Sequence, residues 1–367
     1  MILCADPKAA YLAQKSAIDA AIARVLGSGR YILGSEVTVF EAEFAQYIGV
    51  RHGIGVANGT DAITIALKAL RVGLGDEVIT TAHTAVATVS AIELASATPV
   101  FADIEPKYFT LDPAKVEQML SPRTKAIVAV HLYGQPADLT GLLEISRKHG
   151  IPLVEDCAQC HGARYAGKRL GSFGALAAFS CYPTKNLGAL GDAGIIVSDD
   201  SALAERCRVL REYGWAERYV SHSPGQNSRL DELQAAVLRV KLARLDDANA
   251  LRDARARSYD EGLSELWFGL PARRDNAQHV FHLYVVRCRE RERAIARLRA
   301  AGVAPLVHYP VPIHQQPAYA RRIRGADALP ETERAAREVL SLPMYPELLE
   351  SDVQLVLGAL SDLEESE

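Results

Sequence analysis

The stretch VEDCAQCHGA combines several side chains that could do chemistry. Cys157 and Cys160 are separated by two residues and followed by His161, which is the attachment pattern of a c-type haem and also a redox or zinc pattern. Asp156 and Gln159 stand beside the cysteines. Three hypotheses are therefore open: a haem protein, a thiol enzyme, or a site built from the residues around the cysteines.

Cysteine usage and the N-terminus argue against the haem and zinc hypotheses. The chain of 367 residues has 6 cysteines, and only Cys157 and Cys160 are close together. A structural zinc site needs a second pair of Cys or His ligands at short spacing, which the sequence does not offer. The N-terminus lacks the features of an export signal, and c-type haem attachment usually requires export. We therefore expect a cytoplasmic protein without a disulfide framework.

Composition and charge exclude several classes of partner. The sequence is 49% hydrophobic, enough for a large core, and its apolar runs are too short to span a membrane. The net charge is -4 and no block of Lys or Arg occurs. We therefore expect neither nucleic acid nor a membrane as a partner.

Lys185 is the second candidate for chemistry. It lies in FSCYPTKNLGALGDAG, a glycine-rich and nearly uncharged loop that also holds Ser180 and Tyr182. A lysine in such a loop is either solvated or buried. A buried amine has a lowered pKa, which favours the neutral, nucleophilic form. The loop alone leaves both interpretations open.

The elements that must position these residues form a regular alternation. Apolar runs of strand type begin at residues 53, 76, 98, 125, 151, 175 and 194. Helical patterns lie between most of them, at 60–70, 85–95, 138–150 and 201–214. This alternation predicts an α/β fold with a mostly parallel seven-stranded sheet flanked by helices. Asp156 would then lie near the carboxyl end of a strand, where open parallel sheets bind ligands.

A second, smaller domain is expected at the C-terminus. A long helical pattern over 229–262 leads into it, followed by a strand in HVFHLYVVRC and a helix in RERAIARLRAAG that ends at Gly302. We predict a large domain over 1–250, including an N-terminal arm and helix, and an α+β domain over 251–367.

The segment GVANGTDAITIALKAL predicts a strand, a turn and a helix, with Asn58, Gly59 and Thr60 at the junction. Free backbone N–H groups at a helix start attract anions, and Gly59 would let a phosphate approach closely. An ordinary N-cap explains the turn equally well. The glycine spacing does not match a dinucleotide-binding fingerprint.

Taken together, the phosphate turn, Asp156 with Gln159, Ser180 and Lys185 are the parts needed to hold pyridoxal 5'-phosphate. Several segments in order also resemble the nucleotide-sugar aminotransferases of the DegT/StrS group, which share the aspartate-aminotransferase fold (type I). They are ANGTDA, HLYGQPADL, VEDCAQCHGARYAGKRLGSFG, FSCYPTKNLGALGDAG, NSRLDELQAAVLRVKL and VHYPVPIHQQPAY. The resemblance covers nearly the whole chain.

The resemblance implies a role for each residue of the cofactor site. Lys185 corresponds to the Schiff-base lysine that also carries the proton, Asp156 to the partner of the pyridine nitrogen, and Gln159 to a side chain near the ring oxygen. The phosphate ligands would be Gly59, Thr60 and Ser180. Asn227 would reach the phosphate of the other subunit's cofactor, which implies a homodimer with shared active sites.

One departure from the family pattern concerns the cofactor ring. Many relatives have an aromatic residue at the position of Ala85, where it stacks on the cofactor. His83 could replace that ring, contact substrate or only pack. Cys157 and Cys160 correspond to small residues in relatives, so we interpret both as small buried hydrophobes.

The resemblance implies a nucleotide-linked keto-sugar as substrate and glutamate as amino donor, with 2-oxoglutarate as product. The candidate contacts are Arg30, Tyr31, Tyr182, His308, Tyr309 and His314. The loop sequence around Lys185 favours amination at C3 of a dTDP-3-keto-6-deoxyhexose. The alternatives are C4 amination of a UDP-, GDP- or dTDP-4-keto sugar, C3 amination of a keto-hexuronate, and a non-catalytic sugar-nucleotide sensor on the same fold.

Overall fold

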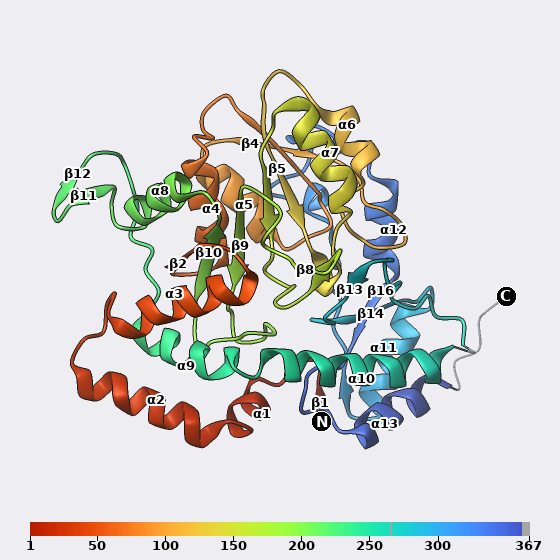
Figure 1. The fold of residues 1–367 in the computed structure, drawn as a ribbon. Helices are drawn as coiled ribbons and strands as arrows, with labels where there is room; N and C mark the ends of the chain where they lie inside the picture. Colours follow the sequence, from red (N-terminus) through yellow and green to blue (C-terminus); the bar gives the residue numbers. More distant parts are fainter. Residues whose placement is uncertain (265, 362–367) are drawn as a thin grey trace.

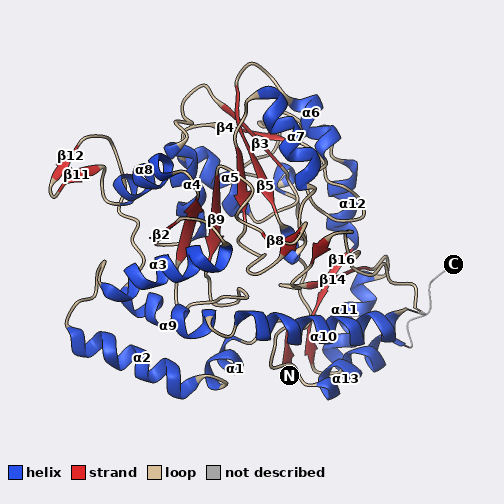
Figure 2. Ribbon diagram, viewed as in Figure 1, coloured by secondary structure: helices blue, strands red, loops and turns tan. Residues whose placement is uncertain are grey.

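The computed structural model describes residues 1–264 and 266–361. A large sheet at the centre is covered by helices on both faces, and a smaller C-terminal part lies beside it (Figures 1 and 2). The predicted C-terminal domain is therefore described only to Ser361, and its last six residues lie outside the described residues.

The central sheet has seven strands in the order β2-β10-β9-β6-β5-β3-β4. β10 runs antiparallel to both of its neighbours, and the other pairs are parallel. This confirms the predicted mostly parallel seven-stranded sheet. The bounds of the strands are β2 His52–Val56, β3 Glu77–Thr80, β4 Thr98–Phe101, β5 Thr124–Val130, β6 Leu153–Asp156, β9 Leu176–Ser180 and β10 Gly194–Ser198.

Both faces of the sheet are buried, which explains why its strands are apolar throughout rather than alternating. Ile127 of β5 belongs to one core layer and Val128 to the other, because successive side chains of a strand point to opposite faces. The first layer packs on α3 Ser35–Ile48, α6 Pro113–Met119 and α7 Leu139–His149. The second packs on α4 Gly59–Ala69, α5 Val86–Leu94 and α8 Ser201–Arg211.

The single helical pattern expected over 229–262 is two helices. α9 Glu232–Leu242 ends at Ala243, and α10 Leu245–Leu263 begins after Arg244. α9 packs in the core of the central sheet, where Leu245 at the start of α10 joins it. The later part of α10 packs in the core of the C-terminal part, with Ala256, Tyr259 and Leu263. The predicted domain boundary at 250 falls inside α10, and the division remains a prediction.

The C-terminal part contains a two-stranded sheet covered by helices. β14 Tyr284–Arg287, shorter than the predicted strand, pairs antiparallel with β16 Val339–Leu342. The N-terminal arm joins this part, because β1 Ile2–Leu3 pairs with β15 Val303–Ala304. The helices are α11 Arg291–Ala300, α12 Pro330–Glu338 and α13 Glu350–Ser361.

The remaining elements lie outside the central sheet and the two-stranded sheet of β14 and β16. They are α1 Pro7–Leu12, α2 Lys15–Ser28, the short strands β7 Arg164–Tyr165, β8 Lys168–Arg169 and β13 Ala277–Gln278, the 3-10 turns η1 Leu132–Gly134 and η2 Ile313–Gln315, and the hairpin of β11 Trp215–Glu217 and β12 Val220–Ser221. The hairpin projects away from the body of the molecule, at the left of Figure 1. No helix in the described part of the chain has the length and apolar character needed to cross a membrane.

Candidate active site

A cavity of about 240 Å³ lies at the carboxyl ends of the central parallel strands. It is bordered by the start of α4, the start of α5, the residues after β6 and the loop after β9. This is the edge where open α/β sheets bind ligands. Seven of the predicted site residues line it together: Gly59, Thr60, Asp156, Gln159, Ser180, Tyr182 and Lys185.

Asp156 is a buried carboxylate at the last position of β6. Its Oδ2 atom accepts a 2.8 Å hydrogen bond from the hydroxyl of Thr88, and its Oδ1 atom accepts one of 3.1 Å from the backbone N–H of Ala158. Burial raises the pKa of Asp156, and these two donors and the amine of Lys185 act in the opposite direction. The carboxylate is therefore held in one orientation at the cavity wall.

Lys185 lines the same cavity from the loop between β9 and β10. Burial lowers the pKa of its amine to about 8, although the negative charge of Asp156 acts in the opposite direction. Of the two interpretations that the sequence left open, the structure therefore favours the buried amine. A share of that amine is uncharged near neutral pH and able to attack a carbonyl carbon.

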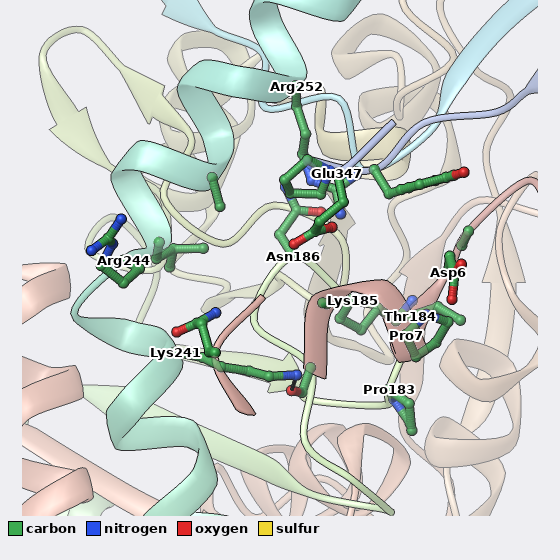
Figure 3. A pocket seen from close by; sticks show the side chains of 18 residues that line it. Asp6, Pro7, Pro183, Thr184, Lys185, Asn186, Lys241, Arg244, Arg252 and Glu347 are labelled. Atoms are coloured by element: carbon green, nitrogen blue, oxygen red, sulfur yellow. Dashed lines mark hydrogen bonds between the residues drawn. The ribbon is translucent and has the colours of Figure 1, made fainter. Parts of the chain in front are cut away.

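The loop of Lys185 also lines a second, smaller cavity of about 50 Å³. Figure 3 shows Lys241, Arg252 and Glu347 around this loop. Lys241 Nζ donates to the carbonyl of Gly188 at 2.6 Å, and Asn186 Nδ2 donates to the carbonyl of Val280 at 3.1 Å. These contacts tie the loop to α9 and to the C-terminal part.

The start of α4 provides an anion cradle. Asn58 caps the helix by accepting the N–H of Asp61 at 2.8 Å, which leaves the first N–H groups, at Gly59 and Thr60, directed out of the helix end. A Cβ atom at Gly59 would lie 2.5 Å from Cβ of Ser180. Only glycine therefore lets the Ser180 hydroxyl lie beside this helix end, and the three residues together fit a phosphate group.

His83 does not line the cavity. It is 1% exposed, and its ring packs against Phe109 and Tyr133, with Nε2 2.8 Å from the Tyr133 hydroxyl. Ala85 presents only a methyl group to the cavity. Of the three roles considered for His83, these contacts support packing.

Gln159 links the cavity to the C-terminal part. Its Oε1 atom accepts the backbone N–H of Tyr133 at 2.7 Å, and its Nε2 atom donates to the hydroxyl of Tyr309 at 3.2 Å. Two other predicted substrate residues have partners away from the cavity wall. His308 Nδ1 lies 2.8 Å from the Ser341 hydroxyl, and His314 Nε2 lies 3.1 Å from Glu333.

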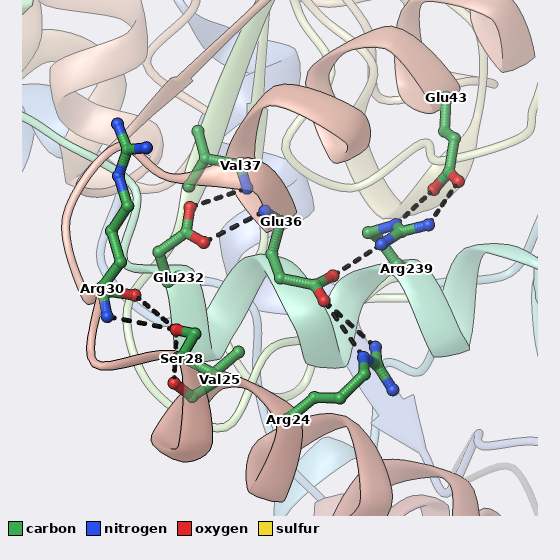
Figure 4. A network of polar contacts seen from close by, with 9 residues as sticks. All are labelled: Arg24, Val25, Ser28, Arg30, Glu36, Val37, Glu43, Glu232 and Arg239. Atoms are coloured by element: carbon green, nitrogen blue, oxygen red, sulfur yellow. Dashed lines mark hydrogen bonds and ion pairs between the residues drawn. The ribbon is translucent and has the colours of Figure 1, made fainter.

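Arg30, Tyr31 and Asn227 are exposed and do not line the cavity of their own chain. The loop that carries Arg30 and Tyr31 is fixed to the start of α9, because Glu232 accepts the backbone N–H group of Gly34 at 2.7 Å. Glu232 also accepts the N–H groups of Glu36 and Val37 at 3.0 and 2.9 Å, as Figure 4 shows. A bridge between Ile32 and Asp231 adds to this attachment. The loop that leads into α3 is therefore attached to the same end of α9 into which the segment of Asn227 leads.

Two site residues escaped the sequence analysis. Thr88 bonds Asp156, and Tyr133 bonds Gln159. Thr84 lies just before the N-cap residue Ala85 and Thr88 lies in the first turn of α5, with their hydroxyls 3.2 Å apart. Neither threonine stood out in the sequence as a partner of Asp156. Nothing in the spacing of Tyr133 indicated its contact.

The Cys157–Cys160 pair belongs to the protein core. Both cysteines are free and fully buried in the layer with Phe40 and Phe179, and burial raises the pKa of both thiols. His161 is likewise buried, with its ring 5.3 Å from that of Phe179. These contacts fit the interpretation of the cysteines as small hydrophobes, and they indicate a structural role for His161.

One group of potential metal ligands, His131, Glu155 and Cys157, is occupied by other bonds. The Glu155 oxygens accept backbone N–H groups of the 171–174 loop at 2.8–2.9 Å and face His131 Nε2 at 3.2 Å. His131 Nδ1 accepts the N–H of Ala137, so its Nε2 atom carries the proton that bonds Glu155. The group is a hydrogen-bonded support for the loop that follows β8.

Comparisons with known proteins agree with this geometry. The model of the DegT/DnrJ/EryC1/StrS aminotransferase family matches residues 13–361. The dTDP-3-amino-3,4,6-trideoxy-alpha-D-glucose transaminase of Streptomyces venezuelae is 48% identical over 97% of this chain and 94% of its own length. The erythromycin biosynthesis sensory transduction protein EryC1 of Saccharopolyspora erythraea is 50% identical over 97% of both chains.

Solved structures show the same fold. The crystal structure of S. venezuelae DesV in complex with a ketimine intermediate aligns with a TM-score of 0.95 and 48% identity, over 98% of this chain and 97% of that one. NtdA from Bacillus subtilis, solved with bound PMP, aligns with a TM-score of 0.88 and 32% identity, over 95% of this chain and 81% of that one. The chain therefore belongs to the DegT/DnrJ/EryC1/StrS aminotransferase family of pyridoxal-phosphate-dependent enzymes.

Proposed function

We propose that this protein transfers an amino group from glutamate to C3 of a dTDP-linked 3-keto-6-deoxyhexose. The observation that carries the proposal is that Lys185, Asp156 and the start of α4 border one cavity. Relatives from S. venezuelae, Micromonospora megalomicea and Aneurinibacillus thermoaerophilus, at 45% to 48% identity, are dTDP-3-amino sugar transaminases by name, and this similarity supports the choice of C3.

Each side chain has a proposed task at a stated atom. Bound pyridoxal phosphate would supply an electron sink for the carbon that loses a proton. The Lys185 amine would take that proton and return it in the second half-reaction. The Asp156 carboxylate would keep a proton on the pyridine nitrogen, and the Gln159 amide nitrogen would donate to the ring oxygen. Gly59, Thr60 and Ser180 would hold the phosphate.

We also propose a homodimer with shared active sites. Among the described residues that line the cavity, Lys185 is the one cation, yet a nucleotide diphosphate and glutamate each bring at least two negative charges. Arg30, Tyr31 and Asn227 are exposed and do not line their own cavity, so they are available to a partner. Tyr182, Tyr309, His308 and His314 complete the proposed substrate contacts. The predicted cytoplasmic location belongs to the same proposal and rests on the sequence.

A sugar-nucleotide sensor is the second candidate, because two relatives at 48% and 50% identity are named as a regulatory and a sensory transduction protein. The intact pair of Asp156 and Lys185 favours the enzyme, since a sensor needs no neutral amine at the cavity wall. There are two enzymatic alternatives. One is C4 amination, and the other is amination of UDP-linked 3-keto sugars, a reaction named for two relatives at 41% and 44% identity.

One experiment separates these candidates. The protein, supplied with pyridoxal phosphate and glutamate, is incubated with a panel of dTDP- and UDP-linked 3-keto and 4-keto sugars, and products are identified by mass and NMR. We expect amination at C3 of the dTDP sugar and none with Lys185→Ala. Binding of a sugar nucleotide without turnover of any panel member would favour the sensor. Turnover by Lys185→Ala at the normal rate would overturn the assigned role.

The shared site is tested by mixing two inactive variants, Lys185→Ala and Asn227→Ala. A mixed dimer contains one copy of each variant. One of its cavities then combines the intact Lys185 of one chain with the intact Asn227 of the other, and the second cavity lacks both residues. Random reassortment should then restore on the order of a quarter of the wild-type activity. Mixing two preparations of the same variant is the control. A mixture without recovered activity, although mixed dimers form, would contradict sharing through Asn227.

A further inference from the structure

Tyr133 is a buried tyrosine in a left-handed turn for which the proposed function has no task. It lies in η1, directly after β5, with a φ of 62°, and is 3% exposed. A bulky residue in this conformation costs on the order of 1–2 kcal/mol, so surrounding contacts must hold it there. Its backbone N–H contacts Gln159 in the active site, and its hydroxyl contacts His83 and the backbone of His308 in the C-terminal part.

The backbone N–H of Tyr133 decides which end of the Gln159 amide faces the cavity. The N–H group lies 2.7 Å from the Gln159 atom assigned as Oε1. Because a backbone N–H can only donate, the atom opposite must be the oxygen. Nε2 is thereby turned to the other side, where one N–H donates to the hydroxyl of Tyr309 at 3.2 Å. The second N–H of Nε2 is left for an oxygen atom in the cavity that Gln159 lines.

The hydroxyl of Tyr133 fastens the turn to the C-terminal part. It donates to the backbone carbonyl of His308, and this uses its only proton. His83 Nε2, 2.8 Å away, must therefore donate to the same hydroxyl oxygen. This agrees with a neutral His83, because burial lowers the pKa of His83 to about 3. Phe109 meets the Tyr133 ring nearly edge-on at 5.8 Å.

We propose that Tyr133 is a positioning residue for the oxygen end of the cofactor. Its hydroxyl holds the left-handed turn, and the N–H of that turn keeps the amide nitrogen of Gln159 directed into the cavity. If the turn relaxed, the amide could rotate and present its oxygen to an anionic ring oxygen, which would repel it. The inference rests on the proposed function, because it concerns the group that Gln159 would meet there.

The test follows the visible absorption of the protein loaded with pyridoxal phosphate as a function of pH. A hydrogen-bond donor beside the anionic ring oxygen of the cofactor stabilises the form of the bound cofactor that has lost its proton. Loss of the donor therefore raises the pH at the midpoint of the absorbance titration. Gln159→Leu removes the donor and should raise it by about one pH unit. Tyr133→Phe, which deletes one hydroxyl and keeps ring and N–H, should raise it by roughly half a unit.

The matched control is Tyr309→Phe, which deletes the hydroxyl on the opposite side of the same amide. The N–H of Tyr133 still orients Gln159 there, so the midpoint should stay within about 0.2 units of wild type. A Tyr133→Phe midpoint equal to wild type, with Gln159→Leu shifted, would overturn the positioning role. Equal shifts in both tyrosine variants would also overturn it. A wild-type protein that takes up no pyridoxal phosphate would contradict the proposed function and this inference together.

Discussion

The hydroxyl of Thr88, at the start of α5, donates a 2.8 Å hydrogen bond to the Oδ2 atom of Asp156 at the end of β6. The two residues are 68 positions apart in the chain and meet only because their elements converge at the same edge of the sheet. The bond favours the ionised form of the carboxylate and so opposes the effect of burial, which raises the pKa of Asp156.

Thr88→Val should weaken cofactor binding. The variant keeps the shape of the side chain but removes the donor, and a hydrogen bond to a charged group is worth about 1.5–3 kcal/mol. The Kd for pyridoxal phosphate should therefore rise roughly tenfold to a hundredfold. The measurement is a spectroscopic titration of the cofactor-free protein. Thr88→Ser keeps the hydroxyl and should remain within about threefold of wild type. Equal affinities of Thr88→Val and wild type would show that the bond does not support binding.

Lys185 should make the cofactor-free protein less stable below pH 8 than above pH 10. The pKa of its amine is about 8 in the folded state and about 10.4 in an unfolded chain. Between these values the unfolded chain binds more protons, so the free energy of unfolding rises with pH. Relative to Lys185→Met, the stability of the wild type should rise by about 1–3 kcal/mol across this window.

The check is denaturant unfolding of the wild type and Lys185→Met at several pH values. The titration of all other lysines affects both proteins equally, so it cancels in the difference between their free energies of unfolding. A difference that stays constant between pH 8 and pH 10.5 would mean that the amine is not desolvated in the folded state.

Gly59→Ala should damage both the fold and the phosphate site. The added Cβ would lie 2.5 Å from Cβ of Ser180, and separation of the two would cost about 1–3 kcal/mol of stability. It would also displace the hydroxyl from the helix start, so the Kd for pyridoxal phosphate should rise at least about tenfold. Gly73→Ala is the control, because nothing lies within 4 Å of its Cβ position. If Gly59→Ala and Gly73→Ala lost the same stability and affinity, the loss would come from replacing glycine in general and not from the contact with Ser180.

Glu155→Gln should destabilise the protein without involving a metal. Burial raises the pKa of Glu155, but its bonds to His131, Gly171 and Gly174 outweigh this effect and lower the pKa overall. The substitution places an amide NH2 against N–H donors and should cost about 2–4 kcal/mol near neutral pH. The loss should shrink as pH falls below about 4, because the carboxylate becomes protonated.

Thermal unfolding with and without a chelator completes this test. We expect no change with the chelator, since the lone pairs of Glu155 and His131 are engaged by protein donors. For comparison, the surface variant Glu117→Gln should change stability by less than about 0.5 kcal/mol. A melting temperature that falls when the chelator is added would restore the metal hypothesis for His131, Glu155 and Cys157.

The sequence by itself determined the sheet and most of the cofactor site. Apolar runs of strand length between helical patterns specify a parallel sheet, because only a sheet covered on both faces buries every side chain of such strands. Asp156 and Ser180 lie at the ends of two of those runs and Lys185 follows the second, and the carboxyl ends of parallel strands share one edge. Local order along the chain was therefore sufficient to predict their meeting.

Only the tertiary structure decided which side chains support that site. Thr88 reaches Asp156, Tyr133 reaches Gln159 and Glu232 caps α3 across separations that local spacing cannot encode. The helical pattern over 229–262 also did not show that α9 ends at Leu242 and that α10 begins at Leu245. The lowered pKa of Lys185 likewise arises from burial, which is a property of everything packed around the amine and of no single segment.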